Sequence, residues 1–115
     1  MYKRQYLRAV RPSALVSYDA DGGYGHPDHV ALHHISKAAA AEAGVPFIEV
    51  VSQPRDGSIP ARDDIVWFDL PHRLPEVTAA LRQHATQLTV DGTDVVHSGG
   101  QREPIQLRIG LRLVR

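Results

Sequence analysis

The sequence of 115 residues contains no cysteine. Without thiols the chain can form neither a disulfide framework nor a zinc site built on thiolates. Any metal site would have to be made from the 7 histidines and the carboxylates.

The sequence also lacks an excess of either charge and a long apolar run. The 13 basic and 13 acidic side chains give a formal net charge of zero, so no overall field attracts nucleic acid or an anionic membrane. No apolar run approaches the ~20 residues of a membrane span, and no apolar segment follows the basic start as it would in a signal peptide. We therefore expect a cytoplasmic protein with no membrane span.

Aromatic residues are few, at 6% of the sequence, and this bears on the basic residues near both ends. A nucleic-acid surface usually interleaves basic side chains with aromatic platforms, which are missing here. We interpret these basic residues as solvated surface charge and expect no nucleic-acid partner. They are Lys3, Arg4, Arg8 and Arg11, and then Arg102, Arg108, Arg112 and Arg115.

Hydrophobic periodicity predicts one small domain in which helices and strands alternate. The predicted helices are 2–10, 29–43 and 75–85, and the predicted strands are 14–18, 47–51, 65–68 and 105–113. A strand, a glycine-rich loop, a helix and a second strand in succession are typical of a parallel α/β sheet. In such sheets, sites form beyond the carboxyl ends of the strands.

The segment from Asp21 to Val30 is the most informative part of the sequence, because it places two histidines and an aspartate within four residues. Neutral imidazoles and carboxylates are the groups from which a zinc site without cysteine is built. Pro27 keeps the preceding His26 out of the helical conformation. We therefore expect His26 on the loop and His29 at the start of the helix, with different tasks.

The run from Tyr18 to Val30 resembles the second signature of the LmbE-like, or PIG-L, family of zinc-dependent N-acetylglucosaminyl deacetylases, and within it the mycothiol-pathway branch. Residues 80–87 resemble the family's late helix, and residues 104–115 resemble its closing strand. The resemblance thus covers nearly the whole chain. It implies a zinc cofactor and, as substrate, a small N-acetylated amino-sugar conjugate.

The resemblance also implies a role for each residue of the signature. His29 matches a zinc ligand, and His26 matches the histidine that stabilises the oxyanion of the tetrahedral intermediate. Asp28 matches the carboxylate that orients and charges that histidine, and Tyr24 matches a mobile tyrosine at the mouth of the substrate pocket. Zinc polarises the amide carbonyl and activates water, and the cationic imidazole offsets the charge on the oxygen.

The family's first signature, His-Pro-Asp-Asp-Glu, is absent from this sequence. That signature supplies the other zinc ligands and the general base. The resemblance therefore implies that residues 1–115 are the C-terminal portion of a Rossmann-like parallel sheet with flanking helices, and that the N-terminal strands are missing. We expect the exposed edge of such a sheet to favour self-association.

Three functions remain open at this point. The first is a zinc-dependent deacetylase or a truncated form of one, and the second is a non-catalytic remnant or accessory module that keeps half of the fold. The third is a stand-alone metal-binding protein that uses His26, His29 and His33. His33 and His34 are otherwise expected to be packed or solvent-facing, His84 to lie on the surface, and Trp67 and Phe68 to lie in the core.

Overall fold

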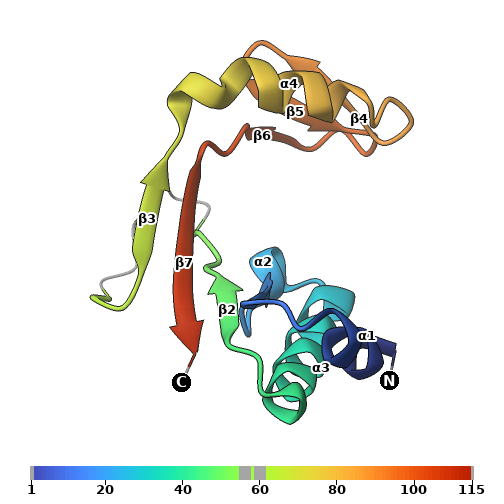
Figure 1. Ribbon diagram of the computed structural model, residues 1–115. Helices are drawn as coiled ribbons and strands as arrows, with labels where there is room; N and C mark the ends of the chain where they lie inside the picture. Colours follow the sequence, from blue (N-terminus) through green and yellow to red (C-terminus); the bar gives the residue numbers. More distant parts are fainter. Residues whose placement is uncertain (1, 55–57, 59–61, 115) are drawn as a thin grey trace. The chain divides into compact units, whose positions relative to one another are not determined.

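The computed structural model describes residues 2–54, 58 and 62–114 (Figure 1). The chain divides into two compact units. The first consists of Met1–Trp67 and Gly110–Arg115, and the second of Phe68–Ile109.

The first unit has a mixed α/β architecture. Its elements are α1 (Tyr2–Val10), β1 (Leu15–Tyr18), α2 (Gly22–Gly25), α3 (Pro27–Ala43) and β2 (Phe47–Val50), with parts of β3 (Val66–Asp69) and β7 (Arg108–Val114). The strand order of the sheet is β1-β2-β7-β3. The predicted order of helices and strands in this unit is thus observed, with α2 in addition, where a glycine-rich loop was predicted.

The sheet is mixed rather than wholly parallel as expected. β1 and β2 are parallel, with Leu15 opposite Phe47, and α3 is the crossover connection that a parallel pair requires. β7 runs antiparallel to β2, with Val114 opposite Phe47. The further strands that the family resemblance implies stay a prediction.

The sequence around α3 fixes both of its ends. His26 caps the amino end, Pro27 occupies the first turn, and Gly44 ends the helix in the left-handed conformation at φ 69°. An apolar side chain of α3, Ile35, is 50% exposed. The helix instead buries His33, Ser36, Ala39 and Ala40.

An ion pair is buried between neighbouring strands of this unit. Glu49 of β2 lies opposite Arg112 of β7 and is only 2% exposed. The Nε of Arg112 donates a hydrogen bond of 3.0 Å to Oε2 of Glu49, and Nη2 donates a second one to the same oxygen. The hydrogen bonds with Glu49 raise the pKa of Arg112. Arg112 is therefore an exception to the interpretation of the basic residues as solvated charge.

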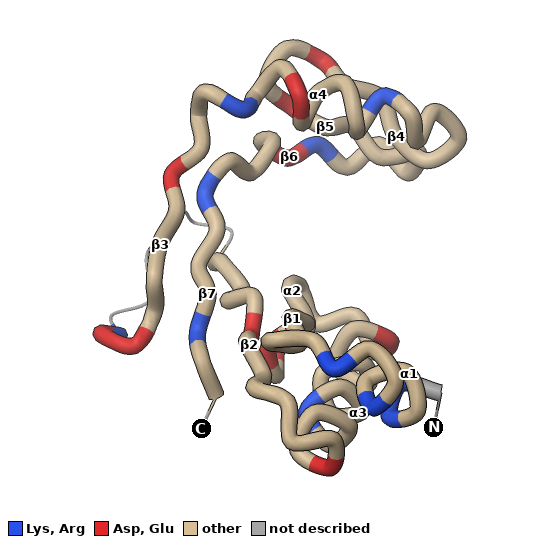
Figure 2. Tube along the Cα trace, in the orientation of Figure 1, with Lys and Arg blue, Asp and Glu red and all other residues tan. Residues whose placement is uncertain are grey.

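Other basic side chains do lie on the surface. Figure 2 shows basic residues gathered on α1, where Lys3, Arg4 and Arg8 are all exposed. Arg4 forms an ion pair with Glu42, which connects α1 to α3. This exposure agrees with the interpretation as solvated surface charge.

The second unit contains a three-stranded antiparallel sheet that the sequence analysis did not predict. Its order is β4-β5-β6, formed by β4 (Leu88–Asp91), β5 (Asp94–His97) and β6 (Arg102–Pro104). A 3₁₀ turn, η1 (Pro71–Arg73), and helix α4 (Leu74–Arg82) precede the sheet. The helix thus ends three residues before the predicted limit of 85.

Long apolar helices are absent from the described part of the chain: none of its helices could reach across a lipid bilayer.

We predict that Arg112→Met lowers the free energy of unfolding by about 3 kcal/mol, because it leaves the Glu49 carboxylate buried without its cation. Arg4→Met is the matched control, since it removes the exposed pair with Glu42 and should cost less than about 1 kcal/mol. Urea unfolding followed by circular dichroism measures both. Equal losses for the two variants would contradict the burial argument.

Candidate active site

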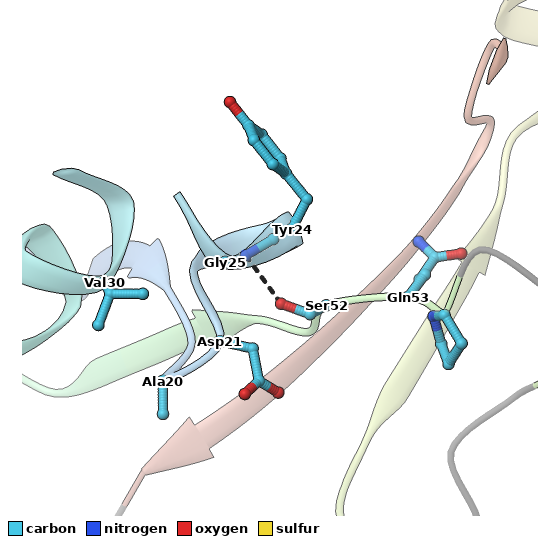
Figure 3. A pocket seen from close by; sticks show the side chains of 9 residues that line it. Ala20, Asp21, Tyr24, Gly25, Val30, Ser52 and Gln53 are labelled. Atoms are coloured by element: carbon cyan, nitrogen blue, oxygen red, sulfur yellow. Dashed lines mark hydrogen bonds between the residues drawn. The ribbon is translucent and has the colours of Figure 1, made fainter. Parts of the chain in front are cut away.

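The loop that follows β1 is held against the segment that follows β2. The carboxylate of Asp19 accepts hydrogen bonds from the backbone N–H of Ser52 at 2.6 Å and from its hydroxyl at 2.5 Å. The Ser52 hydroxyl oxygen in turn accepts a hydrogen bond of 2.9 Å from the N–H of Gly23 (Figure 3). The loop therefore lies at the carboxyl ends of two parallel strands, where the sequence placed the site.

Gly22 brings this loop into close contact with the start of α3. Its φ of 63° is left-handed, and a Cβ atom there would lie 2.8 Å from the backbone nitrogen of Val30 and 2.9 Å from Cβ of His29. No side chain fits at such distances. A glycine is thus required where the loop passes over the helix.

His29 is half-buried in the first turns of α3, and its ring is restrained on two sides. Nδ1 lies 3.1 Å from the carbonyl oxygen of Gly22, which can only accept a hydrogen bond. In the neutral ring the proton is therefore on Nδ1, and the lone pair of Nε2 is available. Tyr18 stacks on the same ring, with a centroid distance of 4.3 Å and an interplanar angle of 6°. A histidine that binds zinc usually has its other nitrogen held in this way.

His26 lies before the helix and is extended, at φ −62° and ψ 130°, as Pro27 predicted. Its Nδ1 accepts a hydrogen bond of 3.1 Å from the backbone N–H of Asp28. The proton of the neutral ring is therefore on Nε2, which makes that atom a hydrogen-bond donor. The structure thus gives His26 and His29 opposite tautomers.

The contact between Asp28 and His26 is made by the backbone N–H of Asp28. In the part of the chain that the structure describes, the Asp28 carboxylate forms no ion pair with a histidine. It is exposed in the first turn of α3, where the helix dipole stabilises negative charge. The implied role of this carboxylate in charging His26 stays a prediction.

The signature residues come together as a cluster of rings. The centroids of His26 and His29 are 5.0 Å apart. Tyr24 meets both rings edge-on, at 5.9 Å from His26 and 5.3 Å from His29, and it is 64% exposed. The resemblance implied a role for three of these residues but none for the stacked Tyr18, which stands at the end of the predicted strand.

A cavity of about 380 Å³ adjoins this cluster and shares Tyr24 with it (Figure 3). Its walls come from the loop after β1, from α3 and from the segment after β2. The lining residues are Ala20, Asp21, Gly23, Tyr24, Gly25, Val30, Ser52, Gln53 and Pro54. Tyr24 thus lies at a cavity, which suits the expected tyrosine of a substrate pocket.

Among the described residues, no three histidine or carboxylate side chains converge as ligands of a metal ion. His29 fits one ligand position, because its Nε2 is available, but a catalytic zinc needs three protein ligands. His33 does not complete the set: it is buried, and its Nδ1 lies 2.8 Å from the carbonyl oxygen of Tyr18. The third hypothesis, a metal site of His26, His29 and His33, is therefore wrong for this arrangement.

The structure also shows the environments of the other histidines and aromatic residues that the sequence singled out. His34 and His84 are exposed. Phe68 is exposed, so its predicted place in the core is wrong, whereas Trp67 is half-buried against Gly110.

Similarity to known proteins covers most of the chain. It is 34% identical, over 86% of its length, to a 1D-myo-inositol 2-acetamido-2-deoxy-alpha-D-glucopyranoside deacetylase of Actinosynnema mirum. Proteins with the same name from Streptomyces griseus and Rhodococcus opacus are 30% and 33% identical, over 96% and 95% of the chain. No family model matches the chain.

The matched regions make up 46% of the first two relatives and 50% of the third. The chain therefore spans about half the length of the curated relatives that it matches.

We predict that Gly22→Ala disturbs the site more than Gly25→Ala does. Both positions have positive φ, which costs an alanine about 1–2 kcal/mol, but only at Gly22 would the new Cβ atom collide with neighbouring atoms. Nuclear magnetic resonance of the His29 ring measures the effect. We expect Gly22→Ala to lose the hydrogen-bonded state of Nδ1 and Gly25→Ala to keep it. An unchanged His29 ring in both variants would contradict the prediction.

Proposed function

We propose that this chain, a relative of the LmbE-like N-acetylglucosaminyl-inositol deacetylases, forms part of the active site of a zinc-dependent enzyme that hydrolyses the acetamide of an N-acetylglucosaminyl conjugate. The observation that carries the proposal is the pair of opposite tautomers. His29 is left with an available Nε2 lone pair, and His26 is left with an Nε2–H donor, in rings 5.0 Å apart.

In this proposal His29 is one ligand of zinc, which when bound polarises an acyl oxygen and lowers the pKa of water to about 7. The chain's own contribution is orientation. The Gly22 carbonyl fixes the tautomer of His29, and the N–H of Asp28 fixes that of His26. The Nε2–H of His26 can then donate to the oxygen on which charge develops, as an oxyanion hole does.

Tyr24 is the residue that connects this chemistry to substrate binding. It contacts both histidine rings and lines the cavity beside them. We propose that the N-acetylated sugar extends from the histidines into this cavity, with Tyr24 closing over it.

The general base and the further zinc ligands have to come from elsewhere, because the 115 residues contain no His-Pro-Asp-Asp-Glu run. We propose that a segment of that kind completes the site. A second candidate function, a non-catalytic accessory module, is favoured by one observation: within the described residues, no set of three metal ligands forms. Turnover after the missing segment is supplied distinguishes the two.

The sheet of the first unit supports association with another polypeptide. Val16 of β1 and Leu113 of β7 flank Ile48 in one row across the sheet, and they are 51% and 48% exposed. In the sheet that the structure describes, β1 is also an edge strand, and an edge strand can pair with a further strand. We propose that the chain self-associates through this surface when no completing segment is present.

We predict no zinc-dependent release of amine by the chain alone, and restored turnover after a segment with the missing signature is added to it. In the completed protein, His29→Ala should abolish zinc binding. His26→Ala should keep the zinc and lower kcat on the order of a hundredfold or more, because one oxyanion donor is lost. Calorimetry with zinc and amine release from N-acetylglucosaminyl-inositol measure the two effects.

His84→Ala serves as the control, since it removes an exposed histidine of the second unit. Loss of zinc in His26→Ala would mean that the two roles are reversed. Failure of the completed protein to turn over substrate would favour the accessory module.

We predict that the purified chain scatters light as a dimer or larger species, and that Val16→Lys shifts it toward the monomer by placing a charge on the exposed row. Ile35→Lys is the matched control, because it places the same charge at an exposed apolar position of α3. A monomeric wild-type chain, or an equal shift in both variants, would contradict association through the sheet.

A further inference from the structure

His33 is a buried polar residue that the proposed chemistry does not use. It lies one helical turn after His29 on α3 and is 3% exposed. Residues four apart share a face of a helix, so the two imidazoles extend from the same side of α3. A buried imidazole without a hydrogen bond would be destabilising, and an apolar side chain would fill such a position at lower cost.

The hydrogen bond of His33 reaches the end of β1. Its Nδ1 lies 2.8 Å from the carbonyl oxygen of Tyr18, and a carbonyl can only accept, so Nδ1 is the donor. Oε1 of Glu49 lies 3.7 Å from the same nitrogen. The buried carboxylate of Glu49 therefore favours a proton on Nδ1 of His33, from which the Tyr18 carbonyl accepts its hydrogen bond.

Glu49 is itself fixed in place. Both hydrogen bonds from Arg112 go to its Oε2, which leaves Oε1 on the side of His33. The three side chains form a continuous series from β7 through β2 to α3, and this series ends at the backbone of β1.

Tyr18 is the link from this series to His29. Its carbonyl is held by His33, and its ring stacks face to face on the ring of His29 at 4.3 Å. His29 is restrained by Gly22 on its Nδ1 edge and by Tyr18 on its face. A shift of the Tyr18 backbone would remove the second of these restraints.

We propose that His33 is a positioning residue for His29: through the Tyr18 carbonyl it sets the plane of the stacked tyrosine and thereby the direction of Nε2 of His29. The importance of that direction for zinc rests on the proposed function, whereas the positioning itself does not.

The test compares His33→Leu with His33→Asn in the full chain by nuclear magnetic resonance. Stacking shifts the ring protons of Tyr18 and His29 upfield, and we expect His33→Leu to lose more than half of this shift. Asparagine places its amide N–H near the position of Nδ1, so His33→Asn should restore most of the shift. His84→Leu, an exposed histidine of the second unit, is the control and should leave the shift unchanged.

A folded His33→Leu variant with the full stacking shift would overturn the proposal, and so would a His33→Asn variant that loses as much of the shift as His33→Leu. If His33→Leu does not fold, His33→Gln replaces it. The glutamine amide reaches the position of Nε2 instead, so the stacking shift should again be lost, and its retention overturns the proposal.

Titration with zinc chloride, in the protein completed with the missing signature, adds a readout at the metal. In His33→Leu, we expect the same change in the His29 ring signals to need about ten- to a hundredfold more zinc. A loss of this size is typical when a residue that holds a metal-binding histidine is replaced. An unchanged response would overturn the effect of His33 on zinc binding at His29, whereas the positioning itself is decided by the stacking shift. The stacking shift needs neither metal nor turnover, so failure of the deacetylase proposal would leave this result intact.

Discussion

The candidate site depends on one carboxylate, that of Asp19. It stands directly after β1 and accepts two hydrogen bonds from Ser52, which follows the neighbouring strand, and one from the N–H of Asp21. These bonds hold the glycine-rich loop across the ends of two parallel strands. Without them the loop would be free to leave α3, and the Gly22 carbonyl would no longer meet His29. The arrangement of the histidines is therefore a property of the loop as much as of the helix.

The two histidines obtain their different chemistry from the backbone alone. His26 precedes the helix and accepts from an N–H that the first turn leaves without a partner, whereas His29 lies within the helix and donates to a loop carbonyl. An N–H donor at His26 and a nitrogen lone pair at His29 are thus only three residues apart in the sequence. A rigid helix start achieves this more reliably than a flexible loop could, because Pro27 and the cap fix the backbone on both sides of the boundary.

The sequence predicted those parts of the fold that local patterns determine. α1, β1, α3 and β2 appear near their predicted limits, because caps, glycines and apolar runs mark them. Asp91, the last residue of β4, and Gly92, which follows it in the turn to β5, are a strong local signal for a hairpin. It was missed because each of the two flanking strands has only 4 residues. The buried face of α3 was not predictable either. His33 is buried because Tyr18 and Glu49 are its partners, and both are remote in sequence.

The position of β7 has a consequence for how the protein is made. It pairs with β2, and Glu49 and Arg112 are 63 residues apart in the sequence. A ribosome therefore completes β1, α3 and β2 well before the cation that neutralises Glu49 is synthesised. During that interval the Glu49 carboxylate lacks Arg112. Closing a loop of this length also costs conformational entropy, which slows the pairing of β7 with β2. Until β7 is made, β2 lacks one of its two neighbours in the sheet, and Glu49 lacks its cation.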